Sequence, residues 1–222
     1  MTSSTTSSPK DKRLRWAFAL ERMSVGWNLL VGVAGVIVGM FASSLALLSL
    51  GADEIAATVG AAVVAWQFYA EGQKPPGDLG HKCPEWVTRL TGALLTLFCL
   101  WLAVASICNL LGSGARPVAS TFGIEIAGVS FASTIALSRA KLAFAAALAS
   151  AALREEAWRT IASVWVSGIT LLGLSANVAF DWWWADPVAA FLLIAFLGMS
   201  GWQDLFGPLS PDITARRLKG EQ

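Results

Sequence analysis

Two adjacent carboxylates, Asp53 and Glu54, are the residues of this chain that most clearly indicate chemistry. They lie near the middle of residues 44–69, an apolar stretch long enough to cross a bilayer as a helix. Acidic side chains are costly in hydrocarbon, so they usually face a protein interior and mark an ion or proton path. The alternatives are a position at the lipid headgroups or neutralisation by a basic partner.

The composition indicates the environment of these carboxylates. The chain has 222 residues, of which 55% are hydrophobic and 14% are charged. A soluble domain of this size cannot bury so much apolar surface, so the sequence predicts an integral membrane protein in contact with a lipid bilayer. The apolar segments long enough to span it are residues 23–41, 44–69, 90–111, 117–137, 160–180 and 182–202. The basic, alanine-rich residues 138–159 are expected to connect the fourth and fifth segments, with residues 141–152 extending the fifth helix into the cytoplasm.

Basic residues set the expected orientation, because cytoplasmic loops carry an excess of lysine and arginine. With both termini on one side, Arg116 is the only lysine or arginine on the opposite side. We therefore predict an all-α integral membrane protein of six transmembrane helices with cytoplasmic N and C termini. Residues 1–13 are expected to form a disordered cytoplasmic tail, residues 14–206 the transmembrane domain and residues 207–222 a second short tail. The absence of organelle-targeting signals favours a bacterial inner membrane.

The sequence favours neither an enzyme nor a nucleic-acid-binding protein. It contains no Ser/His/Asp catalytic pattern, no phosphate-binding loop and no HExxH helix. The net charge of +1 gives no electrostatic reason for a polyanionic partner. We therefore expect no enzymatic activity and no nucleic-acid partner.

Three local patterns occur in a recognisable order. The first apolar segment contains Trp27-Asn28, and the turn into the sixth reads Ala185-Asp186-Pro187. The second segment carries a G-x-x-x-x-S-x-A-L-x-x-x-G-x-D string, made of Gly39, Ser44, Ala46, Leu47, Gly51 and Asp53. Together they resemble the six-helix membrane domain of the cation diffusion facilitator family over residues 14–206. The resemblance is strongest to short members that lack a cytoplasmic C-terminal domain.

The resemblance implies a homodimer that exports a divalent metal in exchange for protons. The family site is tetrahedral, with D-x-x-x-D on the second helix and H-x-x-x-D on the fifth, since residues at i and i+4 share one helix face. Protons compete with the metal for these ligands, which couples the two fluxes. In this chain Asp53 matches the first position and Ala57 the second. Aligning Glu156 with the family aspartate three residues before the histidine puts Arg159 and Ser163 at the other two positions.

One interpretation of this altered site is an ion pair in place of the metal. Arginine stays protonated and cannot become a metal ligand. A contact between Asp53 and Arg159 would neutralise both side chains in hydrocarbon and join the second and fifth helices.

The other interpretation is a relocated, oxygen-rich metal site. Asp53, Glu54 and Glu156 would supply carboxylates, Asn28 a carbonyl oxygen and Ser163 a hydroxyl. Such donors suit magnesium or manganese better than zinc. Two geometric points weigh against it. Adjacent residues are about 100° apart around a helix, and the expected spans place Glu156 about 15 Å from Asp53 in depth.

Two functions follow from these interpretations. The first is a proton-coupled transporter of zinc, manganese, magnesium or a similar ion with an altered site, favoured by the retained acidic cluster. The second is a transport-inactive relative that serves as a structural or accessory subunit of a larger membrane complex, favoured by Ala57, Arg159 and Ser163. Outside this site, Asp186 is expected to cap the sixth helix at its outer end.

Overall fold

The computed structural model describes residues 9–70, 85–113, 117–118 and 120–206. Its helices are α1 (Pro9–Ala42), α2 (Leu45–Ala70), α3 (Glu85–Leu110), α4 (Thr121–Leu148), α5 (Ala151–Phe180) and α6 (Ala185–Phe206). All six are long and apolar enough to cross a membrane. The predicted class of all-α, six-helix membrane protein is therefore confirmed. Helix α1 begins before the expected boundary at residue 14, while the rest of both expected tails lies outside the described residues.

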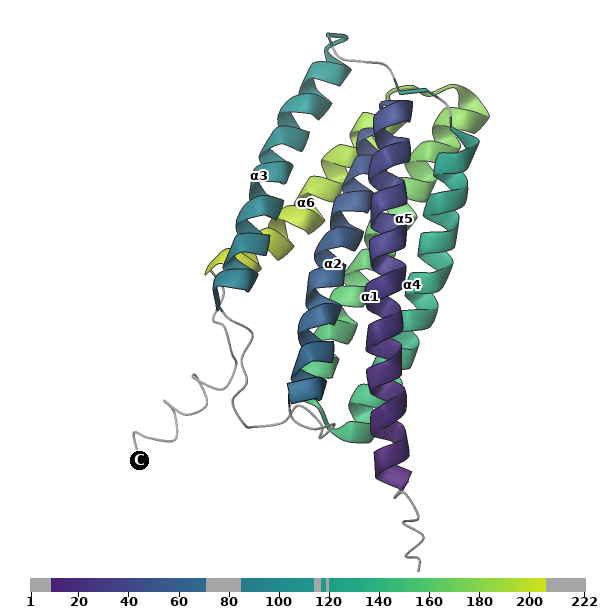
Figure 1. Cartoon of the computed structure of the whole chain (residues 1–222). Coiled ribbons are helices and arrows are strands. Elements are labelled where there is room, and N and C mark those ends of the chain that lie inside the picture. Colours follow the sequence, from purple (N-terminus) through teal and green to yellow (C-terminus); the bar gives the residue numbers. More distant parts are fainter. Residues whose placement is uncertain (1–8, 71–84, 114–116, 119, 207–222) are drawn as a thin grey trace, which may run out of the picture.

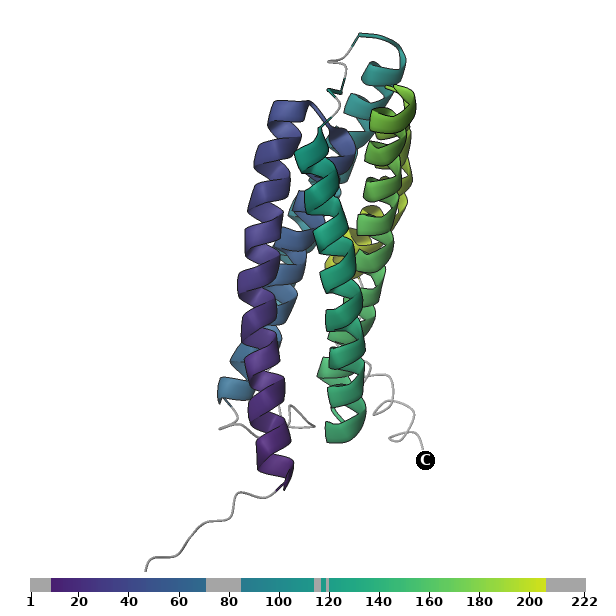
Figure 2. The ribbon, with the colours of Figure 1, turned by 90° about the vertical axis from the view of Figure 1, so that its right-hand side faces the viewer.

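The helices form an elongated bundle with one helix set apart from the others. Helices α1, α2, α4 and α5 run side by side, and α3 lies at the edge of the molecule against α6 (Figure 1). The view turned by 90° shows α1 and α4 side by side along most of their length (Figure 2). The indole of Trp27 donates a hydrogen bond to Ser133 at 2.9 Å, which joins α1 to α4. Large apolar side chains such as Leu97, Trp101 and Phe191 are exposed, as expected of a surface in contact with lipid.

Small residues bring α1 and α2 into close contact. A Cβ atom added at Gly51 would lie 2.7 Å from the Val36 backbone nitrogen and 2.9 Å from the Gly32 carbonyl oxygen. No side chain fits between backbones that approach so closely, so glycine is required at this position. The connection is short, since α1 ends at Ala42 and α2 begins at Leu45. The predicted tight hairpin is confirmed.

The connection between α4 and α5 differs from the prediction. Helix α4 continues to Leu148, and α5 begins at Ala151 after a turn in which Ala149 adopts a left-handed conformation with φ of 51°. The Ser150 side chain accepts a hydrogen bond from the Leu153 backbone nitrogen and caps α5. The alanine-rich segment therefore belongs mainly to α4, and Lys141 is buried within the bundle instead of lying in the cytoplasm.

Asp186 has a different role from the one predicted. It lies in the first turn of α6, but its carboxylate accepts hydrogen bonds from the Ser44 hydroxyl and from the Leu45 backbone nitrogen at 2.8 Å. It thus satisfies an otherwise unpaired donor at the N-terminus of α2. The expected cap of α6 is corrected to a cap of α2, which fixes the two helices to each other at the outer end.

Candidate functional site

Asp53 faces α5, as the alignment to the metal-site positions requires. The groups of α5 that interact with its carboxylate are the Ser163 hydroxyl and the Arg159 guanidinium. One carboxylate oxygen, Oδ2, is buried and has no hydrogen-bond partner among the described residues. Ala57 is buried one turn further along α2. Of the four positions aligned with the family ligands, Asp53, Arg159 and Ser163 therefore interact at one contact between α2 and α5, and only Asp53 is a carboxylate.

The antiparallel register of α2 and α5 places Ser163, and not Glu156, at the depth of Asp53. Thr170 donates to the Ala46 carbonyl at 3.4 Å, and a Cβ added at Gly60 would lie 2.8 Å from the Glu156 carboxylate. These two contacts bracket the Asp53–Ser163 contact along the same pair of helices. Gly60 lies two turns of α2 from Asp53, so Glu156 is about 10 Å from Asp53 in depth. The predicted separation in depth therefore holds for Glu156, while Ser163 lies level with Asp53.

Arg159 is paired, but with a residue of α6. Its Nη1 and Nη2 atoms donate to the two carboxylate oxygens of Asp204 at 3.0 and 2.6 Å. Arg159 also interacts with Asp53 through its charge, but its two Nη atoms donate their hydrogen bonds to Asp204. Asp204 is itself held closely by α3, since a Cβ at Gly92 would lie 2.8 Å from the Asp204 Cβ. The ion pair therefore joins α5 to the α3–α6 pair.

Glu54 points away from Asp53. It is 3% exposed and accepts a hydrogen bond of 2.6 Å from the Ser130 hydroxyl of α4. Asp53 faces α5 while Glu54 faces α4, as their angular separation on one helix requires. The two adjacent carboxylates thus enter different contacts and do not form one ligand set.

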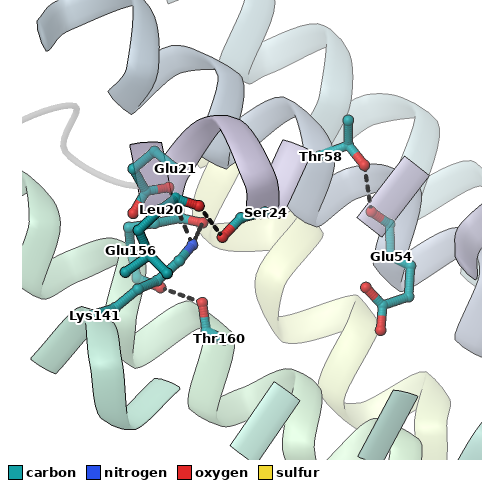
Figure 3. Close-up of polar contacts among 8 residues, drawn as sticks. All are labelled: Leu20, Glu21, Ser24, Glu54, Thr58, Lys141, Glu156 and Thr160. Carbon is teal, nitrogen blue, oxygen red and sulfur yellow. Dashed lines mark hydrogen bonds and ion pairs between the residues drawn. The ribbon is translucent and has the colours of Figure 1, made fainter. Parts of the chain in front are cut away.

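Glu156 belongs to a third group of charges. Its carboxylate accepts a hydrogen bond of 3.1 Å from the Lys141 ammonium of α4, and Lys141 also lies 3.2 Å from Glu21 of α1 (Figure 3). The relocated metal site is therefore not assembled, because Glu156, Glu54 and Asp53 each have different neighbours. Asn28, the other proposed donor, is buried in α1. Within the described ranges no three His, Cys, Asp or Glu side chains are grouped to hold a metal ion.

Sequence reasoning missed Glu21 and Lys141, although their spacing carries a signal. Glu21 was placed outside the first span, and Lys141 in a connection. A polar stripe runs along each of α4 and α5 at intervals of three and four residues, which is one helix face. The buried members are Ser130, Thr134, Ser138 and Lys141 on α4, and Glu156, Thr160, Ser163, Ser167 and Thr170 on α5.

A six-helix membrane bundle with buried carboxylates between its helices defines a class of ion-translocating membrane proteins. The family model described as the cation efflux transmembrane domain matches residues 22–206, and the chain belongs to this family. The resemblance to cation diffusion facilitators is thereby confirmed. No curated protein matches the chain. The chain is an integral membrane protein of the cation-transporter type. The alignment to the family pattern puts Asp53, Ala57, Arg159 and Ser163 at its metal-site positions.

The donors at these four positions do not fit a tetrahedral zinc site. Zinc prefers nitrogen and sulfur donors with carboxylates, usually three or four from the protein. Here the contact offers one carboxylate and one hydroxyl beside an arginine. Oxygen donors of this number fit a hard ion that keeps part of its water shell, because Mg²⁺ is commonly bound through one or two carboxylates and several waters.

Proposed function

We propose that this chain is a proton-coupled transporter of divalent cations, with a substrate site at the α2–α5 contact that favours magnesium or manganese over zinc. Asp53 supplies the charged ligand and Ser163 a second oxygen. The observation that carries the proposal is the buried Asp53 Oδ2 atom, which has no hydrogen-bond partner among the described residues. A buried, unsatisfied carboxylate oxygen is costly unless a ligand or proton binds it.

The pairing of Arg159 supports a cation at this place. A lone guanidinium beside Asp53 would repel a divalent ion. The carboxylate of Asp204 cancels that charge through two hydrogen bonds, so the negative charge of Asp53 stays available. Lys141, the buried lysine of α4, is shared by Glu21 and Glu156. The hydrogen bonds to Asp53 and Glu54 come from the hydroxyl groups of Ser163 and Ser130.

The experiment is cation flux into proteoliposomes of the full chain, with zinc, manganese and magnesium each tested across a pH gradient. Asp53→Asn keeps the size of the side chain and removes its charge. Glu125→Gln is the matched control, since Glu125 is exposed near the outer end of α4. Saturable flux that is lost in the first variant and kept in the second supports the proposal.

A second candidate function is a transport-inactive subunit of a membrane assembly. The Arg159–Asp204 pair favours it, because an ion pair that fixes α5 to α6 opposes the helix movement that transport needs. Absence of flux above empty liposomes, from protein shown to be folded and inserted, would support this function.

We further propose that the chain forms a homodimer, lies in a bacterial inner membrane and has no enzymatic activity. Molar mass from light scattering in detergent tests the dimer.

A further inference from the structure

Three charged side chains from three helices meet near the ends of the helices where α4 turns into α5. Lys141 of α4 lies between Glu21 of α1 and Glu156 of α5, at 3.2 and 3.1 Å from their carboxylate oxygens (Figure 3). Their side chains are only 0%, 1% and 5% exposed for Glu21, Lys141 and Glu156. This cluster, named here the buried triad, is separate from the contact of Asp53 with Ser163.

The buried triad has one more acidic than basic group. If all three side chains are ionised, the cluster carries one excess negative charge inside the membrane domain. Two carboxylates that share a single counter-ion in a low-dielectric site oppose each other's ionisation. Such pairs take up protons as a coupled unit.

In the described parts of the neighbouring helices, the one further cation that acts on this charge is Arg159, which interacts with Glu156 but is itself neutralised by Asp204. Helix α2 meets the Glu156 carboxylate at Gly60, where an added Cβ would lie 2.8 Å from Glu156 Oε2. Glycine has no side chain, so Gly60 supplies no charge at this contact. Arg159, one turn from Glu156 on α5, is bonded to Asp204. Glu54 is a further carboxylate within the electrostatic reach of Lys141.

Glu21 is the carboxylate of the triad that lacks hydrogen-bond donors in the described part of the chain. Its side chain is fully buried, and neither of its carboxylate oxygens has a hydrogen-bond partner among the described residues. Lys141 forms an ion pair with Oε2 at 3.2 Å and donates a hydrogen bond of 3.1 Å to Glu156, so Oε1 of Glu21 is the oxygen left without a cation or a donor among the described residues. A buried carboxylate oxygen without a donor is costly, and adding one proton to this group removes the excess charge.

We propose that the Glu21–Lys141–Glu156 triad is a binding site for one exchangeable proton, distinct from the substrate site at Asp53. The proton adds to a carboxylate oxygen of the pair and leaves a neutral cluster of one acid, one carboxylate and one ammonium. On release it passes to water at the nearby helix ends. Its use in coupling proton flux to cation flux rests on the proposed function, whereas the binding of the proton does not.

The polar stripe of α4 connects the triad to the interior carboxylates. Ser138, Thr134 and Ser130 follow Lys141 toward the outer side on the same helix face, and the Ser130 hydroxyl binds Glu54 at 2.6 Å. This stripe gives the triad a polar route toward the α2 carboxylates, instead of an apolar barrier.

The test is infrared difference spectroscopy of the full chain in lipid nanodiscs, without any transported cation, between acidic and alkaline buffer. We expect a carbonyl band of a protonated buried carboxyl group that titrates with pH. It should be lost or displaced in Glu21→Gln or in Glu156→Gln, and unchanged in Glu125→Gln. The first two substitutions preserve side-chain size, and circular dichroism checks that each variant is folded.

The outcomes separate this proposal from the transport proposal. A band that persists unchanged in both triad variants, or that is lost only in Asp53→Asn, would overturn the proton site. A band that follows the triad in a protein without cation flux would keep the proton site and reject the proposed transport. In an active transporter, Glu21→Gln should abolish the dependence of flux on the pH gradient, while Asp53→Asn abolishes flux itself.

Discussion

Arg159 of α5 and Asp204 of α6 are joined by two hydrogen bonds of 3.0 and 2.6 Å. The alignment to the family pattern puts Arg159 at the position of the metal-binding histidine, where it would replace a neutral ligand with a permanent cation. Asp204 neutralises this arginine from the neighbouring helix α6. Planar guanidinium–carboxylate contacts of this kind are the strongest and most directional ion pairs in proteins.

The Arg159–Asp204 pair should contribute measurably to the stability of the bundle. Asp204→Asn keeps the shape and removes the charge, and we expect it to lower the free energy of unfolding by about 2 kcal/mol. The estimate is below the range for a fully buried pair because the arginine side chain is 36% exposed. Denaturant unfolding of Arg159→Leu, Asp204→Leu and the double variant measures the coupling. Single and double variants whose losses simply add would show that the two residues do not act as a pair.

Lys141 should be needed to keep Glu21 and Glu156 together at neutral pH. Lys141→Met removes the only ammonium of the triad and leaves two buried carboxylates, at a cost of about 3 kcal/mol or more. Acidification should recover part of the loss, because protonated carboxyl groups no longer repel each other. Thermal unfolding at neutral and acidic pH measures both effects.

The matched variant is Lys141→Met combined with Glu156→Gln, which removes the carboxylate–carboxylate repulsion and should unfold at a higher temperature than Lys141→Met alone at neutral pH. Equal unfolding temperatures for the two would show that Glu156 and Glu21 do not oppose each other.

Gly51 should be the least replaceable glycine of the α1–α2 contact. An added methyl group would lie 2.7 Å from one backbone atom of α1 and 2.9 Å from another, and backbone cannot move aside as a flexible side chain does. We expect Gly51→Ala to destabilise the hairpin by about 2 kcal/mol or more. Gly198→Ala is the control, since nothing lies within 4 Å of the added atom and alanine favours a helix by about 1 kcal/mol. Unfolding in detergent compares the two, and a Gly51→Ala protein as stable as the control contradicts the close packing.

Asp186 should stabilise the start of α2 through its contacts with Ser44 and Leu45. Asp186→Ala leaves the Leu45 backbone nitrogen without its carboxylate acceptor, and we expect a loss of about 1–2 kcal/mol. Hydrogen exchange should speed up in the first turn of α2 more than in the first turn of α6. Faster exchange in the first turn of α6 instead would support the original expectation of a cap on α6. Glu125→Ala is the control, because Glu125 is exposed and its loss should leave exchange at both turns unchanged.

The sequence correctly predicted the features that depend on local composition, which are the membrane spans and the short connection between α1 and α2. Hydropathy summed over a helix length finds each span, because a bilayer of fixed thickness requires a fixed number of apolar residues. The alignment to the family pattern also placed Ser163 opposite Asp53, as the structure shows. In the same way the short Ala42–Leu45 connection fixed the α1–α2 hairpin.

Only the tertiary structure decided which charges meet. Arg159 and Asp204 lie far apart in the chain, and Glu21 meets Lys141 only because α1 packs on α4. These contacts depend on the rotation and register of each helix, which the average hydropathy of a span leaves undetermined. Residues such as Glu21 and Lys141 lie near the ends of apolar runs, where composition alone places them in water. Packing buries them because an ion pair formed between helices offsets the loss of hydration that each charge would suffer alone.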